Sequence, residues 1–294
     1  MPHYRACNLT LRQVNLNLRP MNTEKRHLGT WANAPLAFVQ AVVAFPPLMD
    51  LANRIGKAHS AILERFPRFS QDFNLQVTGA GSAPRGTTAF VYASADNTLG
   101  VRINANSITC QTVKYVGSQD FILAFAETAK DILAALEVAH VAQTSFQTID
   151  LFCPSGKRAA SHVLVPSLRP WQPSATNVDG KLQMAQEVYQ FVGADPHHIA
   201  VAHLHHEVGN VLPPGFDPIA LALSKPQVVA RDLLQADARN RFTFLLINAL
   251  HVLEIPAKVG AFGLVEDMTK LHAAGKQIFM AAVTTDAISA WSAP

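Results

Sequence analysis

"APLAFVQAVVAF", residues 34–45, decides the fold, because it is an apolar run rich in valine and phenylalanine, which favour strands. Pro46 and Pro47 end the run, since proline cannot donate to the hydrogen-bond ladder of a sheet. Apolar residues then recur at helical spacing as far as Pro67. A strand followed directly by an amphipathic helix is therefore predicted. The stripe of that helix consists of Leu48, Leu51, Ala52, Ile55, His59, Ile62 and Phe66.

The rest of the first half predicts a β-meander, a second helix and a returning strand. "TTAFVYASADNTLGVRIN", residues 87–104, places two short β segments around the turn pair Asp96-Asn97, and "SITCQTVKYV", residues 107–116, supplies a third. Ser118 can cap the next helix, in which apolar residues recur from Ile122 to Leu136 at steps of three and four. "TSFQTIDLF", residues 144–152, is a further strand.

The second half offers a similar order after a proline-rich connection, residues 154–180. "KLQMAQEVYQFV", residues 181–192, reads as a short helix. Three β runs and a final helix then follow. They are "IAVAHLHHEV" (199–208), "PIALALS" (218–224), "RFTFLLINALHVLEI" (241–255) and the helix "LVEDMTKLHAA" (264–274).

These patterns predict an α+β protein of two similar halves, each an antiparallel sheet covered on one face by helices. The halves are residues 1–153 and 181–294, joined by 154–180. A short echo supports duplication, because "VKYVGSQDFILAFAETAKDIL" and "AKVGAFGLVEDMTKLHAA" each run strand, Val-Gly, helix. A parallel α/β fold is the alternative. It is less favoured, since the β segments come in runs and do not alternate with helices.

Composition narrows the classes of function. Charged residues make up 15% of the chain, where about a quarter is usual, which favours an exterior partly buried against another subunit or partner. A compact alanine-rich monomer is the alternative. A net charge of +3 with scattered basic residues argues against nucleic-acid binding. We expect neither a membrane span nor a signal peptide, because no apolar run is long enough for either. The three separated cysteines are expected in a protein of the reducing cytoplasm.

Five histidines lie within "HHIAVAHLHHEVGN", residues 197–210, and raise the question of a metal site. On a strand, His203 and His205 point to one face and His206 to the other. A catalytic zinc needs three protein ligands and an open position. The third ligand could be His197, His198, Glu207 or the distant His251, and Glu207 could also act as general base on a metal-bound water.

Other features weigh against this metal site. "HLHHE" matches neither the "HExxH" helix of zinc proteases nor the "HxHxDH" loop of the metallo-β-lactamase fold. The sequence therefore favours a half-exposed strand whose imidazoles lie at an interface or in water and titrate near neutral pH.

Four segments together carry a resemblance to a known family: "NAPLAFVQAVVAF", "ERFPRFS", "KYVGSQDFILAFAETAKDILAAL" and "LLINALHVLEI" followed by "LHAAGKQIFMAAVTTDAISAW". Their order and spacing along most of the chain resemble a bacterial family described as sporadically distributed proteins of unknown function. The chain departs from the family's pattern at "FQTIDLFCPS" and at "LLINALHV", where relatives carry other polar residues. The resemblance implies a fold and a bacterial origin, with no catalytic residues to carry over.

We therefore expect a non-catalytic binding protein, an accessory subunit of a bacterial multi-protein system that needs no cofactor. Its partner would be another protein or peptide, or a second copy of the chain. The alternative is a metal-dependent enzyme, hydrolytic or redox, that binds a transition metal through His203, His205 and either His206 or His197, with Glu207 as base.

Overall fold

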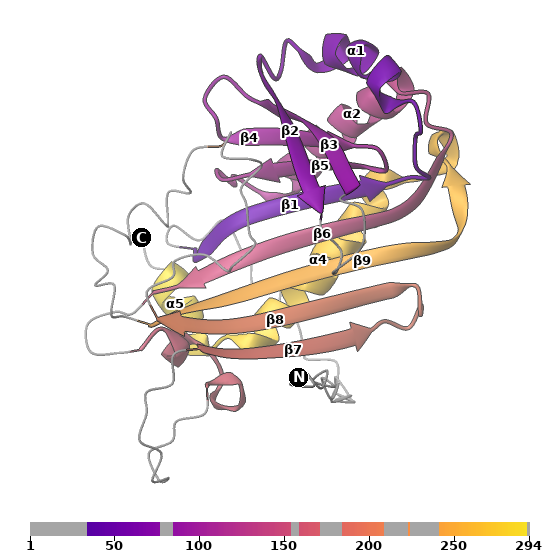
Figure 1. Ribbon diagram of the computed structural model, residues 1–294. Coiled ribbons are helices and arrows are strands. Elements are labelled where there is room, and N and C mark those ends of the chain that lie inside the picture. Colours follow the sequence, from indigo (N-terminus) through magenta and orange to yellow (C-terminus); the bar gives the residue numbers. More distant parts are fainter. Residues whose placement is uncertain are drawn as a thin grey trace, which may run out of the picture.

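The computed structural model describes residues 34–76, 85–153, 159–170, 184–208, 223 and 241–292 (Figure 1). Within these ranges the chain forms a mixed α/β fold dominated by one antiparallel sheet of nine strands, in the order β2-β3-β4-β5-β1-β6-β9-β8-β7. The strands are β1 (Leu36–Ala44), β2 (Arg68–Gln76), β3 (Arg85–Ala93), β4 (Leu99–Asn104), β5 (Ser107–Thr112), β6 (His140–Phe152), β7 (Met184–Val192), β8 (His198–Val208) and β9 (Arg241–Lys258). The helices are α1 (Leu51–Ile62), α2 (Ser118–Ala135), α4 (Leu264–Ala282) and α5 (Thr285–Ser292), with 3-10 turns at Ala160–Val163, Pro166–Leu168 and Val259–Ala261.

The predicted opening is confirmed, because β1 is followed by the helix α1. The β3–β4 turn is confirmed as well: Asn97 adopts a φ of 57°, a left-handed conformation that asparagine tolerates better than most residues. Ser118 is the first residue of α2 and Gly117 is its N-cap, so the expected Ser118 cap was wrong. Strand β2 was missed, since the predicted helix ended at Pro67 and no element was predicted for the residues that follow.

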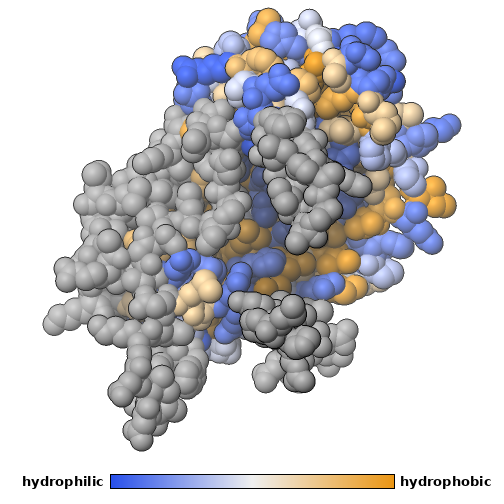
Figure 2. Space-filling view, viewed as in Figure 1, coloured by the Kyte–Doolittle hydropathy of each residue, from blue (hydrophilic) through white to orange (hydrophobic). Residues whose placement is uncertain are grey.

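Helices cover one face of the sheet. In Figure 1, α4 runs behind β6 and β9, and α2 is seen near the top of the view, below α1; α2 packs against α4 and β1. The main core forms here, because alternate residues of β1, Val39, Ala41 and Val43, point toward α2 and α4. The opposite face carries a smaller apolar cluster that includes Phe38 and Phe244. Figure 2 looks onto this helix-free face and shows hydrophobic residues across the middle of the sheet.

The segment 181–192, expected to be helical, contains the strand β7. Met184, Val188 and Val192 are spaced four residues apart, which is compatible with one side of a helix. Because four is also a multiple of two, the same three residues lie on one face of a strand. Pairing with β8 along all nine residues of β7 decides between the two. The correction changes the order expected for the second half, which begins with a hairpin of strands.

The single sheet joins both halves of the sequence through the pairing of β6 with β9. The first half supplies the neighbouring strands from β2 to β6, and the second supplies β9, β8 and β7. The similarity of the two halves stays a prediction. The predicted strand at 218–224 lies outside the described residues except for Leu223, which is buried in the apolar cluster of the helix-free face. In the described part, no helix is long and apolar enough to cross a membrane.

Candidate functional site

His198 and His251 form a cross-strand pair near the turn between β7 and β8. The register places His198 of β8 directly opposite His251 of β9, and their rings stack with centroids 3.9 Å apart and planes 19° from parallel. The next residues on the same face, Ala200 and Ala249, are buried in the main core. Both imidazoles therefore point to the helix-covered face of the sheet.

Asp267 of α4 holds His251 in place. Its side chain is almost buried, and its Oδ1 atom lies 2.7 Å from Nδ1 of His251. The Thr144 hydroxyl also donates to Asp267, and Thr144 lies opposite His251 in the β6–β9 register. Because a carboxylate accepts hydrogen bonds, Nδ1 of His251 carries the proton. In the neutral form of the ring the lone pair would then be on Nε2, the arrangement in which a carboxylate commonly orients a metal-binding histidine.

Asp195, in the turn between β7 and β8, completes the group. Its Oδ1 accepts the backbone N–H of His197 at 2.9 Å, and its Oδ2 lies 2.9 Å from Nδ1 of His198. The hydrogen bond from the His197 backbone, and then that from His198, lower the pKa of Asp195 below its usual value. This carboxylate is therefore ionised at neutral pH, and it is half exposed to solvent.

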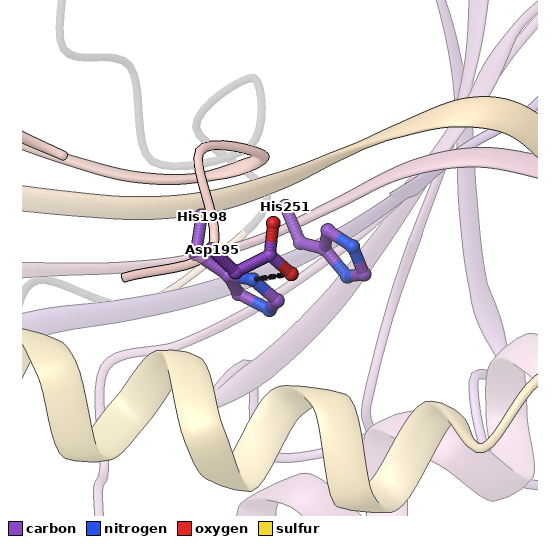
Figure 3. Close-up of side chains that lie close together, drawn as sticks. All are labelled: Asp195, His198 and His251. Atoms are coloured by element: carbon purple, nitrogen blue, oxygen red, sulfur yellow. Dashed lines mark hydrogen bonds and ion pairs between the residues drawn. The ribbon is translucent and has the colours of Figure 1, made fainter. Parts of the chain in front are cut away.

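The three side chains could hold a metal ion. One ligand atom from each of Asp195, His198 and His251 lies within 4.8 Å of the other two, and Figure 3 shows the three side chains close together, with the contact between Asp195 and His198 dashed. Ligands about 2.0–2.2 Å from a tetrahedral zinc are separated by about 3.3–3.6 Å. Because the two rings are stacked with planes 19° from parallel, at least one imidazole would have to turn before both ring nitrogens could point at the same ion. Three protein ligands would leave one position for water. In the described part, no other group of His, Cys, Asp and Glu meets the same distance limit.

Without an ion, the same residues form a polar network. Nε2 of His198 is buried, makes no hydrogen bond within the described part, and lies 3.7 Å from Oδ1 of Asp267. His198 therefore stands between two carboxylates, Asp195 and Asp267. Such a network joins the β7–β8 turn to α4 across β9, which is a structural role that needs no ligand.

The structure divides the five metal ligands expected from the sequence among three places. His203, His205 and Glu207 share the helix-free face, as alternation predicts, and His205 lies 2.6 Å from Glu207. His206 points to the helix-covered face and contacts Thr243 at 2.9 Å. His197 lies at the exposed turn, 3.8 Å from Glu254.

Burial also gives these histidines different pKa values. Desolvation lowers the pKa of His203, and it lowers the pKa of His206 to about 4. His206 therefore lies apart from His203 and His205. His198 and His251, each of which the sequence offered only as a possible third ligand, instead lie next to each other near the β7–β8 turn.

Sequence reasoning missed the two carboxylates of the cluster. Asp267 could have been found, because it falls on the apolar stripe of its helix beside Met268 and Leu271, where a charged residue needs a partner. Asp195 has a weaker signal, the turn sequence Asp-Pro-His directly before a strand.

A second candidate site is the outer edge of β7. Within the described ranges, β8 is the only strand that pairs with β7, so this edge of the sheet is unpaired (Figure 1). The side chains on its helix-free face are exposed, among them Met184 at 53% and Val192 at 59%. Glu187 is the one charged residue of the strand, which contains no lysine or proline. Edge strands usually carry lysine, other charged residues or proline, which hinder pairing with the strand of another chain.

No protein-family model matches the chain, and none of the curated proteins matches it. The chemistry of both sites therefore rests on their own geometry.

Proposed function

We propose that the protein is a non-catalytic binding protein, an accessory subunit of a bacterial multi-protein system that pairs the outer edge of β7 with an extended segment of another polypeptide. The unpaired edge carries the proposal. Backbone N–H and C=O groups along an edge strand form a template for a further strand, and alternate side chains supply specificity. The low content of charged residues, 15%, agrees with a surface that is covered in an assembly.

The two ends of the sheet differ in a way that favours β7. The other edge strand, β2, carries Arg68 and Asp72, and Asp72 is 3.4 Å from Arg102 of β4. Charged side chains on an edge strand oppose pairing with another chain. Strand β7 instead exposes Met184, Val188 and Val192 on one face. It also lies in the second half, 181–294, which would then be the binding half of the two expected from the sequence.

A lysine scan of exposed positions tests this proposal. The full chain, the variant Val188→Lys and the control Ile255→Lys would each be used to capture proteins from a lysate of the native host. Ile255 is 79% exposed on β9, so the control removes an exposed apolar side chain away from the edge. We expect one stoichiometric partner, either a host protein or the host's own copy of this chain, to bind the parent and the control but not Val188→Lys. Capture of the same partner by all three chains would contradict the proposal.

A second candidate function, transition-metal binding, is favoured by the group of Asp195, His198 and His251. Two imidazoles and a carboxylate suit zinc and its neighbours among the transition metals. The ion would connect the β7–β8 turn to β9 and so stiffen the hairpin whose edge is proposed to bind.

Titration of the metal-free full chain with zinc chloride tests this second function. We expect one ion per chain, with binding lost in His198→Ala and in His251→Ala. His203→Ala is the matched control, because it lies on the same strand and on the other face. Loss of binding in His203→Ala alone would instead favour the metal-dependent enzyme with His203, His205 and either His206 or His197 as ligands. Absence of stoichiometric binding would contradict both metal sites.

A further inference from the structure

We propose that the polypeptide paired with β7 is the β7 strand of a second copy of this chain, arranged about a two-fold axis that passes through Val188. The inference rests on the proposed function of the β7 edge and names its partner. It follows from the order of residues in "MAQEVYQFV", which is complementary to itself when two copies run antiparallel.

The axis would stand perpendicular to the sheet, so that the helix layers of both copies lie on the same side. Directly opposite residues in an antiparallel pair point to the same face. With Val188 at the centre, every residue of β7 lies opposite a β7 residue of the second copy. The pairs are Met184 with Val192, Ala185 with Phe191, Gln186 with Gln190, Glu187 with Tyr189, and Val188 with itself.

Each pair matches in chemistry. On the helix-free face the exposed residues alternate apolar and glutamine, so an apolar residue meets an apolar one and an amide meets an amide. On the other face, small Ala185 meets large Phe191. Glu187 meets Tyr189, and the Tyr189 hydroxyl already donates to Glu187 within one chain. Because a phenol has one hydrogen, Tyr189 would donate to the carboxylate of the second copy in exchange for the bond within its own chain.

Other registers are poorer. A two-fold axis through Glu187 would place two carboxylates opposite each other, and like charges in opposite positions destabilise a strand pair. An axis through Tyr189 would leave Met184 and Ala185 without opposite residues in β7. The axis through Val188 is the one that pairs all nine residues, Met184 to Val192, and keeps the two Glu187 side chains apart.

Cysteine pairs test both the partner and the register. Opposite residues of an antiparallel pair have Cβ atoms about 4.5–5.5 Å apart, close enough for a disulfide after small shifts. We expect mild oxidation to convert Val188→Cys into a covalent dimer. Gln186→Cys and Gln190→Cys should each stay at the level of the parent chain with its three native cysteines, and the double variant should form dimers.

Sedimentation velocity on the uncrosslinked full chain completes the test. We expect a reversible dimer that shifts at least tenfold toward monomer in Val188→Lys and is unchanged in Ile255→Lys. A parent chain that stays monomeric at every concentration would overturn the inference, as would a dimer that Val188→Cys does not crosslink. A monomeric parent that still loses a host partner in Val188→Lys would leave the proposed function standing and remove only this partner.

Discussion

His198 and His251 lie directly opposite each other on neighbouring strands, with their rings stacked 3.9 Å apart between centroids. The two histidines are 53 residues apart in the sequence. Together with Asp195 and Asp267 they connect a surface turn, the sheet and a helix. This connection explains how the edge hairpin β7–β8 is fixed to the rest of the fold.

Replacing His251 should destabilise the protein. In His251→Ala, Oδ1 of the nearly buried Asp267 loses its donor while Oδ2 keeps the Thr144 hydroxyl, and leaving a buried polar atom unsatisfied costs about 1–3 kcal/mol. Urea denaturation followed by circular dichroism measures the free energy of unfolding. His197→Ala is the control, because that side chain is 42% exposed and should change the free energy by less than about 0.5 kcal/mol. Equal stability of parent and His251→Ala would contradict the network.

Zinc should raise the melting temperature of the parent chain. A ligand that binds only the folded state stabilises it by about 2.7 kcal/mol at one hundred times its dissociation constant. We expect this shift in thermal melts with zinc chloride, and we expect Asp195→Asn to reduce it by weakening one ligand. His203→Ala should keep it. A melting temperature that does not respond to zinc in the parent would contradict the metal site.

The raised pKa of Asp150 predicts that the folded protein becomes less stable at alkaline pH. Burial raises its pKa from 3.8 to about 8, so the folded protein binds a proton that the unfolded chain releases. Its contribution is therefore full at low pH and is lost as the pH rises from about 4 through about 8. Asp150→Asn, neutral throughout, should lose less stability between pH 5 and pH 9 than the parent. The exposed change Glu64→Gln should behave as the parent does, and a parent-like Asp150→Asn would refute this assignment.

The lowered pKa of His206 predicts that the folded protein becomes less stable at acid pH. Desolvation lowers its pKa from 6.5 to about 4, so the unfolded chain binds the proton more readily than the folded protein. Stability should fall as the pH drops from about 6.5 toward 4. His206→Gln should remove part of this fall in urea denaturation at pH 7 and pH 5. A part should remain, because burial also lowers the pKa of His272 to about 4. An unchanged fall in His206→Gln would assign the effect elsewhere.

Local patterns in the sequence predicted much of the fold. Three predictions depended only on a few neighbouring residues, and all three are confirmed. They are the strand before Pro46, the turn at Asn97 and the apolar stripe of α2. Strand β7 was predicted wrongly, since a spacing of four residues suits both a helix and a strand and only pairing with β8 decides.

The candidate metal site depends on register, which the sequence does not display. Alternation correctly separated His203 and His205 from His206. It could not place His198 opposite His251, because that pairing is set by how β8 aligns with β9. Asp267 enters only through the packing of α4 on the sheet.

Hydrogen exchange of residues 184–192 tests the central claim most directly, because it reports on the backbone of the edge itself. If β7 pairs with a second copy, its amides should exchange more slowly at high protein concentration than at high dilution. The difference should vanish in Val188→Lys and persist in Ile255→Lys. Exchange of this segment at the same rate at every concentration in the parent chain would contradict the account.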